Sequence, residues 1–517
     1  MGTEAGARYV SRRSRRFSQN SFAWHSRWCT QGFPADCADL RRIISLGTAA
    51  GARKSICVNL RDLRETLFEI CGKKTGNCGK IFDIERMESI QSPHRTRIRY
   101  GILALIFVNV VINYLDRSNL SVAATALAGD LKLSSVQLGF IFSAFGWTYA
   151  GLQIPGGLFA DRIGPRLLYA FCLVMWSFAT LCQGFARGFA SLFSFRLATG
   201  AFEAPAYPTN NRIVTSWFPD HERASAIAMY TSGQFIGLAF LTPALVTLQY
   251  YTGWRGLFIV TGIIGLVWGV MWYVFYRDPL EHPRVNQAEL DYIEKGGGVL
   301  SGKKSPEKSA AWRWDDWKQI LTSRTLWGVY LAQFTITGIL WFFLTWFPTY
   351  LVQYRGLNFL KSGYLTSIPF LGACAGLLLS GFLSDYLISK GRSVSVARKA
   401  PIIFGLLLSG CIVGSNYTDN TAVVIFFMSM AFFGSGMATI SWVFVSLLAP
   451  KHLVGLTGGV FNFMGNLASI VVPIVIGFLV KGGSFEPALV FVGGLGLLGA
   501  FSYIFLVGKI QRVGPVS

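Results

Sequence analysis

The chain of 517 residues is 52% apolar and only 14% charged, and its mean hydropathy is +0.44. Soluble globular proteins carry about a quarter charged residues, so this composition excludes that class and favours a membrane protein. The net charge of +21 fits a membrane protein with basic loops on one side, and we expect no nucleic-acid partner.

The first 86 residues differ from the rest of the chain. They hold 16 of the 47 lysines and arginines and five of the nine cysteines, but no apolar run long enough to cross a membrane. The cysteines do not form CxxC pairs, so the pattern does not favour a zinc site. We expect residues 1–86 to be disordered, or to be an extension placed wrongly before a natural start at Met87.

Apolar stretches of roughly 18 to 25 residues recur through the remaining chain, and each can cross a hydrocarbon core of about 30 Å as a helix. The sequence therefore predicts an all-α membrane protein with twelve transmembrane helices. They are expected near residues 98–122, 137–160, 166–187, 189–213, 222–250, 254–277, 325–352, 360–385, 399–416, 420–448, 453–480 and 486–508.

Basic loops orient the predicted helices. The loops "ADRIGPR" (160–166) and "PDHERA" (219–224), the segment 389–399 and the long connection 278–324 are rich in arginine and lysine. With twelve helices, all of these and both termini fall on one side, which the positive-inside rule makes the cytoplasm. We expect a protein of the cell inner (plasma) membrane with both termini cytoplasmic.

The polar connection 278–324 divides the helices six and six. It contains proline and glycine, and we expect it to form short surface helices. The resulting domains are an N-terminal six-helix bundle (87–277) and a C-terminal six-helix bundle (325–517).

The two halves look like repeats of one unit. "GLFADRIGPR" after the second helix corresponds to "GFLSDYLISKGRSVSVARK" after the eighth, and both begin Gly-x-x-x-Asp. The aspartate can cap a helix end or pair there, and the arginines can bridge to neighbouring helices, so we predict a latch for one conformation. The latch residues are Gly157, Asp161, Arg162, Arg166 and Asp385. The "GxxxDRxGxR" pattern resembles the signature loop of the major facilitator superfamily.

Four ionisable residues lie deep within the predicted helices: Asp116, Arg117, Arg196 and Glu203. A charge facing lipid costs at least about 2.5–3.5 kcal/mol, so an inward-facing functional site is the default interpretation. Seven helical residues place Arg196 and Glu203 on one face, two turns apart. The alternative is a buried ion pair that only fixes helix packing. If protons are carried, Asp116 and Glu203 must carry them, because the last six helices contain no interior carboxylate.

Uncharged polar side chains are available to bind hydroxyl groups. They are Tyr149, Gln234, Thr439, Ser441, Trp442 and Asn462. For each of them, a hydrogen bond between helices is the alternative role.

Several motifs together resemble the anion:cation symporter family. They are "NYLDRSNLSVA", "FEAPAYPTNNRIVTSWFPDHERASA", "YTSGQFIGLAFLTP", "QAELDYIEKGGG", "FFLTWFPTYL" and "LTGGVFNFMGN", and the similarity runs from about Arg95 to Val513. The resemblance implies proton-coupled import of sugar acids, although members of that family also move glutamate, sialic acid or phosphate. By motif, it implies that Asp116 and Glu203 are protonation sites with Arg117 and Arg196 as charge partners, and that Tyr149, Gln234, Trp442 and Asn462 line the sugar-acid site.

The sequence therefore predicts a symporter that imports a sugar acid such as D-galactonate by alternating access. Its partners are the small anion, protons as coupling ion and the lipid bilayer, with no cofactor, no metal and a monomeric state. A substrate carboxylate would compete for an arginine, and the displaced carboxylate would take up a proton. The alternatives are a symporter for phosphate or another organic anion and a non-transporting nutrient sensor. An enzyme is disfavoured because the helices hold no catalytic histidine, cysteine or metal cluster.

Overall fold

The structure is a computed structural model that describes residues 95–300, 314–450, 453–508 and 510–512. The expectation for residues 1–86 lies outside the described residues. Everything below concerns the unit that follows Ile90.

The N-terminal half consists of long helices joined by short turns. They are α5 (Ile98–Asp130), α6 (Ser135–Ile163), α7 (Pro165–Gln183), α8 (Phe189–Glu203), α9 (Ala206–Trp217) and α10 (Asp220–Phe275). The backbone of α10 leaves helical geometry at Gly253, where φ is 72° and ψ is 173°. Glycine adopts this positive φ without strain, so the chain can reverse there and α10 supplies two membrane crossings.

The C-terminal half repeats this pattern with more helix breaks. Its long elements are α13 (Arg324–Thr345), α15 (Phe359–Ser389), α16 (Val394–Ser409), α17 (Thr421–Ala438), α19 (Val454–Leu479) and α20 (Glu486–Phe501). Short segments extend or interrupt them: α14 (Phe347–Thr349), η2 (Tyr350–Tyr354), η3 (Gly410–Tyr417), η4 (Thr439–Ser441), α18 (Trp442–Leu448), η5 (Val480–Gly482) and η6 (Ser502–Leu506).

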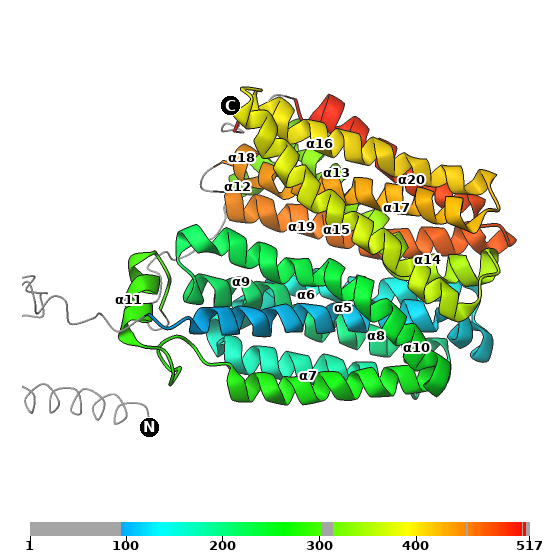
Figure 1. Cartoon of the computed structure of the whole chain (residues 1–517), viewed down its shortest axis with the longest axis horizontal. Coiled ribbons are helices and arrows are strands. Elements are labelled where there is room, and N and C mark those ends of the chain that lie inside the picture. The colour runs from blue at the N-terminus through cyan, green and yellow to red at the C-terminus, as the bar shows by residue number, and fades with distance from the viewer. Residues whose placement is uncertain (1–94, 301–313, 451–452, 509, 513–517) are drawn as a thin grey trace, which may run out of the picture. The chain divides into compact units, whose positions relative to one another are not determined.

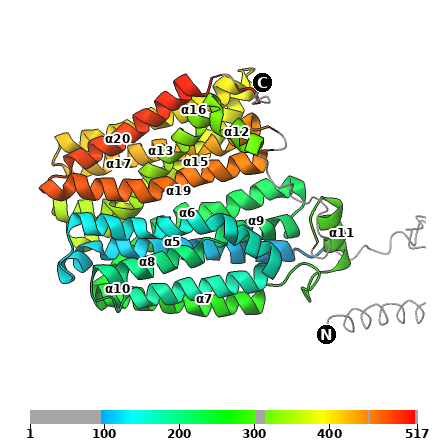
Figure 2. The ribbon, with the colours of Figure 1, turned by 180° about the vertical axis from the view of Figure 1, so that it is seen from behind.

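The described helices confirm the predicted fold class. Within the described ranges, nine helical segments are long and apolar enough to cross a membrane. One of the nine is α10, which makes two crossings, and α6 and the broken pair α8–α9 supply the remaining two. Figures 1 and 2 show α5–α10 grouped together and α13–α20 grouped together.

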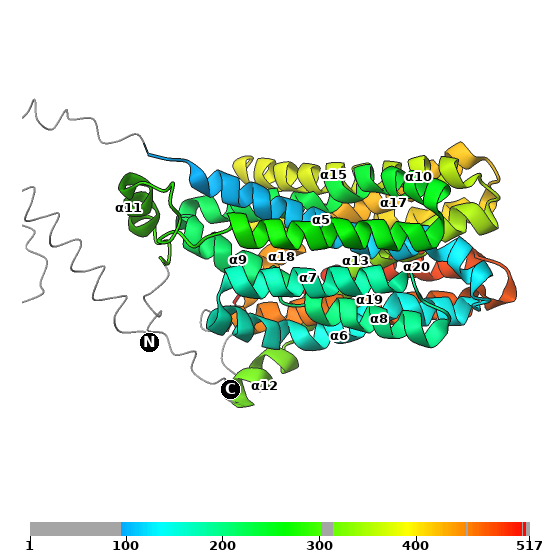
Figure 3. The same cartoon turned by 90° about the horizontal axis from the view of Figure 1, so that it is seen from below.

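The two bundles contact each other through α6 with α19 and through α10 with α15 (Figure 3). Glycines allow this close approach. A Cβ on Gly139 of α6 would lie 2.6 Å from the Pro473 carbonyl oxygen of α19, and one on Gly146 would collide with the hydroxyl of Ser469. These contacts lie in the first half of α6 and the second half of α19.

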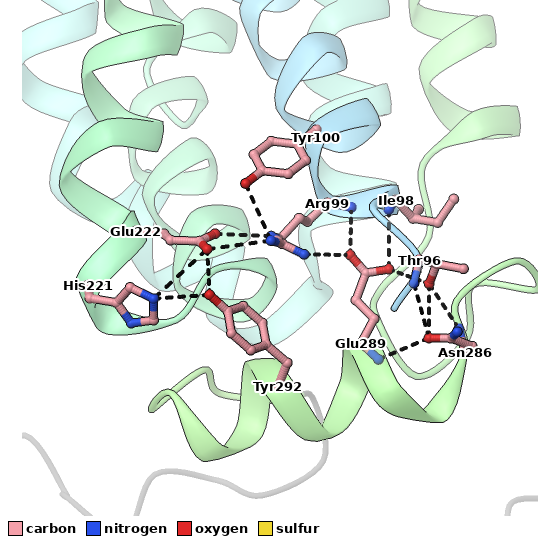
Figure 4. A network of polar contacts seen from close by, with 9 residues as sticks. All are labelled: Thr96, Ile98, Arg99, Tyr100, His221, Glu222, Asn286, Glu289 and Tyr292. Atoms are coloured by element: carbon pink, nitrogen blue, oxygen red, sulfur yellow. Dashed lines mark hydrogen bonds and ion pairs between the residues drawn. The ribbon is translucent and has the colours of Figure 1, made fainter. Parts of the chain in front are cut away.

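The connection between the bundles contains two short helices, as predicted: α11 (Gln287–Lys295) and α12 (Trp314–Thr322). A buried network holds α11 against α5 and α10 (Figure 4). Arg99 of α5 forms ion pairs with Glu222 at 3.0 Å and with Glu289 of α11 at 3.2 Å. Tyr292 donates a hydrogen bond to Glu222 at 2.6 Å, which raises the pKa of the tyrosine. The start of the connection is therefore fixed to the N-terminal bundle.

Candidate functional site

An ion pair lies inside the N-terminal bundle, between α5 and α8. Arg117 donates from Nε and Nη2 to one oxygen of Glu203, at 2.8 and 2.6 Å, and Asn113 donates to the same oxygen at 3.0 Å. Asn113 and Arg117 are one helical turn apart, so both face α8. Glu203 is the last residue of α8, and Pro205 follows it before α9 begins. Both partners are buried, with relative exposures of 7% and 0%.

Aromatic rings enclose the guanidinium of Arg117. Its Cζ lies 4.8 Å from the ring centroids of Tyr114 and Phe145 and 4.9 Å from that of Tyr149. Tyr149 stacks on Phe145 with a centroid distance of 5.0 Å. Cation–π contacts of this kind favour a cation in a dry site. The structure thus brings the predicted Tyr149 against the predicted Arg117, with two further rings that the sequence analysis did not single out.

Arg196 is the second buried cation of this site. It is 1% exposed, and among the described residues its Nε and Nη1 have no hydrogen-bond partner. Its Cζ lies 5.4 Å from the ring of Phe145, and it is within electrostatic range of Glu203 and Asp116. A buried guanidinium with unpaired donors can receive a further anion, because such donors are costly to leave unpaired.

The structure pairs Glu203 with Arg117 and not with Arg196. The two-turn spacing within one helix suggested Arg196 as the neighbour of Glu203, but the hydrogen-bonding partner comes from α5, 86 residues away in sequence. Arg117 thus forms a direct ion pair with Glu203, whereas Arg196 has no direct ion pair among the described residues.

Asp116 faces a different side of α5. It is 1% exposed, and its Oδ1 accepts from Asn119 at 3.4 Å. Asn119 also donates to Thr261 of α10 at 2.8 Å. Within the part of the chain that the structure describes, Oδ2 of Asp116 has no hydrogen-bond partner. The two carboxylates therefore have different hydrogen-bond partners, while both lie within electrostatic range of Arg196.

The predicted polar residues of the C-terminal half gather at the break between α17 and α18. Thr439 is partly buried and donates to the Gly436 carbonyl at 2.7 Å. Ser441 is fully buried and donates to Gln333 of α13 at 3.3 Å, so its hydroxyl makes the hydrogen bond between helices that was the alternative to binding. Trp442 is 50% exposed.

The two predicted amides, Gln234 and Asn462, lie in the fifth and eleventh crossings. Gln234 is partly buried in α10. Asn462 of α19 donates to the oxygen of Gln153 of α6 at 2.8 Å, so it contacts the other bundle.

The sequence analysis missed Gln153, and it also missed Asn113. A helical spacing could have found them, since Gln153 lies one turn after Tyr149 and Asn113 one turn before Arg117.

The predicted latch is described only in part. Gly157 lies in α6, the side chain of Asp161 lies outside what the structure describes, and Arg162 is exposed. Arg166 donates to the Tyr273 carbonyl at 3.1 Å and stacks over that ring at 4.3 Å. In the other half, Asp385 forms an ion pair with Arg398 at 3.2 Å. The loops are thus tied to their own bundles.

Comparison with known proteins places this arrangement in a family. The Major Facilitator Superfamily profile matches residues 106–472. The chain is 52% identical to the D-galactonate transporter of Escherichia coli O6:H1 over 420 residues, which cover 81% of this chain and 97% of the relative. It is 46% identical to the probable galactarate/D-glucarate transporter GudP of Bacillus subtilis over 429 residues, covering 81% of this chain and 94% of the relative.

Solved structures agree on the fold. The inward open conformation of the xylose transporter XylE from E. coli matches with a TM-score of 0.63 at 15% identity, covering 80% of this chain and 97% of that one. A bacterial homolog of the human lysosomal transporter Spinster matches with a TM-score of 0.61 at 20% identity, covering 80% and 95%. At these identities the likeness shows the fold alone.

Proposed function

The chain belongs to the Major Facilitator Superfamily of membrane transporters, and from this premise we propose that it is a proton-coupled symporter that imports a sugar acid such as D-galactonate. It is a multi-pass membrane protein and not an enzyme. The relatives at 52% and 46% identity, named for D-galactonate and for galactarate and D-glucarate, support a sugar acid as the substrate.

The proposal is supported above all by two buried arginines, of which only Arg117 forms a direct ion pair among the described residues. Arg117 is held by Glu203, whereas Arg196 has unpaired donors and lies within electrostatic range of the same carboxylate. An arginine stays protonated in a protein, so Arg196 can take the substrate carboxylate as its counter-ion.

Binding of this anion would couple to protons through Glu203. A second negative charge beside the ion pair weakens the attraction between Arg117 and Glu203. The substrate carboxylate and the Glu203 carboxylate then compete for the same two arginines. A buried carboxylate without its partner is costly and is relieved by taking up a proton. Oε2 of Glu203 has no hydrogen-bond partner among the described residues, so it can accept that proton. Linkage makes the effect reciprocal, and protonation then favours substrate binding.

The sugar hydroxyls would be bound by uncharged side chains from both bundles. We propose Tyr149 and Gln234 from the N-terminal bundle and Thr439, Trp442 and Asn462 from the other. Ser441 would act indirectly through Gln333, since its hydroxyl is already bonded there. Residues 87–277 and 325–517 would move as two bundles, joined by residues 278–324.

We further propose that the protein acts as a monomer in the inner membrane with both termini in the cytoplasm. Each chain contains both bundles, so no second copy is needed to complete the site. The basic loops near Arg162, Arg223 and Arg398 lie on the same side as the described ends of the chain, which supports a cytoplasmic orientation.

Uptake by purified protein in liposomes tests the proposal. Under an inward pH gradient, labelled D-galactonate should accumulate, and unlabelled galactarate, D-glucarate and inorganic phosphate should be compared as competitors. Accumulation of phosphate in place of any sugar acid would favour the phosphate symporter. Binding of a sugar acid without flux would instead identify a sensor.

A further inference from the structure

The carboxamide of Gln153 joins the two bundles. Its oxygen accepts hydrogen bonds from Nδ2 of Asn462 and from Nδ2 of Asn466, each at 2.8 Å. Gln153 belongs to α6, and the two asparagines lie one turn apart on α19. We call these three residues the amide cluster. It forms a hydrogen-bonded link between side chains of α6 and α19, beside the steric contacts at small residues and the edge-on contact of Phe140 with Phe478.

The amide cluster lies where the close contact between α6 and α19 ends. The close approaches of α6 at Gly139 and Gly146 are seven residues apart, and Gln153 follows after another seven, on the same face of the helix. Farther toward the start of α19, a Cβ on Gly455 or Gly459 would meet no atom within 4 Å. The cluster therefore separates a closed portion of the interface from an open one.

The cluster has hydrogen-bonding capacity left over. Gln153 uses its oxygen for both asparagines, so its amide nitrogen keeps two donors, and each asparagine keeps its carbonyl oxygen. Among the described residues these atoms have no partner and are not among the buried unpaired atoms, and all three side chains are only partly buried. These donors and acceptors are therefore not fully buried, and a hydroxyl group that donates and accepts could bind them.

The cluster is next to the anion site. Gln153 lies one helical turn after Tyr149, whose ring is 4.9 Å from Cζ of Arg117. A ligand with a carboxylate at the arginines and hydroxyls along its chain would therefore extend from the anion site toward the amide cluster. Asn462 by itself was predicted to line the site, but one of its two N–H donors is already bonded to Gln153, so the orientation of its amide depends on that residue.

We infer that Gln153 is a positioning residue for the hydroxylated end of the sugar acid. This inference rests on the proposed function. Gln153 holds Asn462 and Asn466 at a fixed spacing, and a substrate hydroxyl donates to the free carbonyl oxygen of Asn462. Recognition of the polyol then requires both bundles at this separation, which ties substrate binding to the relative position of α6 and α19.

Affinity of the purified protein for D-galactonate tests the role of Gln153. Gln153→Met keeps length and packing but loses the accepting amide oxygen, and it should weaken binding about tenfold, as expected for one or two neutral hydrogen bonds. In a double-mutant cycle with Asn462→Ala, the double variant should bind no more than about twofold more weakly than Asn462→Ala alone. Gln137→Met, at the start of α6 and away from the cluster, is the matched control and should bind like the parent protein.

Deoxy analogues of D-galactonate distinguish positioning from packing. The Gln153→Met defect should shrink for the analogue that lacks the hydroxyl bound by the cluster, whereas a packing defect would be equal for all analogues. If Gln153→Met does not fold, Asn466→Leu tests the same cluster from α19 and should weaken binding severalfold. Parental affinity in a folded Gln153→Met or Asn466→Leu variant, or additive effects with Asn462→Ala, would overturn the inference alone. A parent protein that binds no sugar acid would overturn the proposed function as well.

Discussion

Arg117 donates two hydrogen bonds to a single oxygen of Glu203 and leaves the other oxygen of that carboxylate without a partner among the described residues. The pair is asymmetric in consequence. One oxygen holds α5 to α8, while the other makes no hydrogen bond among the described residues. Arg196 is also buried close by. The site therefore contains a second guanidinium that forms no direct ion pair among the described residues.

The close contact of α6 with α19 should be necessary for the transport cycle. A Cβ on Gly139 would lie 2.6 Å from a backbone carbonyl, which cannot move aside easily, so Gly139→Leu should prevent this end of the interface from closing. We expect uptake in liposomes to fall at least about tenfold. Gly151→Leu is the control on the same helix, since a Cβ there meets no atom within 4 Å. Normal uptake by Gly139→Leu would show that closure at this position is not required.

The network around α11 should contribute strongly to stability. Glu289 is fully buried and accepts from the side chain and backbone of Arg99 and from Thr96. Removing one partner of a buried ion pair costs about 3–5 kcal/mol, and we expect the lower end for Glu289→Ala because Glu222 still pairs with Arg99. The measurement is thermal unfolding in detergent together with protease cleavage near α11.

Glu281→Ala provides the comparison for that variant. Glu281 is exposed in the same connection, so its removal should change the free energy of unfolding by no more than about 0.5 kcal/mol. Equal melting temperatures for the two variants would show that the network does not stabilise the bundle.

Hydropathy could predict the twelve crossings, because each needs a long apolar stretch whatever its neighbours are. Partners within the bundle could not be predicted in the same way. Helical periodicity reports which residues share a face of one helix, so it placed Arg196 beside Glu203, whereas the partner Arg117 comes from α5. The same limit applies to Ser441, whose hydroxyl is bonded to Gln333 of another helix.

Import should respond to membrane potential if both buried carboxylates carry protons. Asp116 and Glu203 each have one oxygen without a partner among the described residues, and D-galactonate, the proposed substrate, has a single carboxylate. Two protons per anion would move net positive charge inward, and a potential of 100 mV would contribute about 2.3 kcal/mol per charge. Uptake at a constant pH gradient should rise with an imposed inside-negative potential. Asp116→Asn should abolish this rise, and a potential-independent parent protein would indicate one proton per anion.

Glu203→Gln should separate substrate exchange from proton-driven accumulation. Glutamine resembles the protonated acid in size and can still accept a hydrogen bond from Arg117, so substrate should bind and exchange across the membrane. Accumulation under a pH gradient should be lost, because the carrier can no longer return empty with a deprotonated carboxylate. Substrate-for-substrate counterflow and pH-driven uptake are measured in the same liposomes, with expression and folding checked for each variant.

Arg196→Ala should fail in both assays, and this contrast decides the role of the unpaired guanidinium. The substitution removes a charge-assisted contact worth about 1.5–3 kcal/mol, which corresponds to a loss of roughly tenfold to a hundredfold in affinity. Because Arg196 makes no direct ion pair among the described residues, its removal breaks none of the hydrogen bonds of Glu203. A variant that still exchanges substrate normally would exclude Arg196 as the carboxylate site. If Glu203→Gln also accumulated substrate normally, Glu203 would serve only as the structural partner of Arg117.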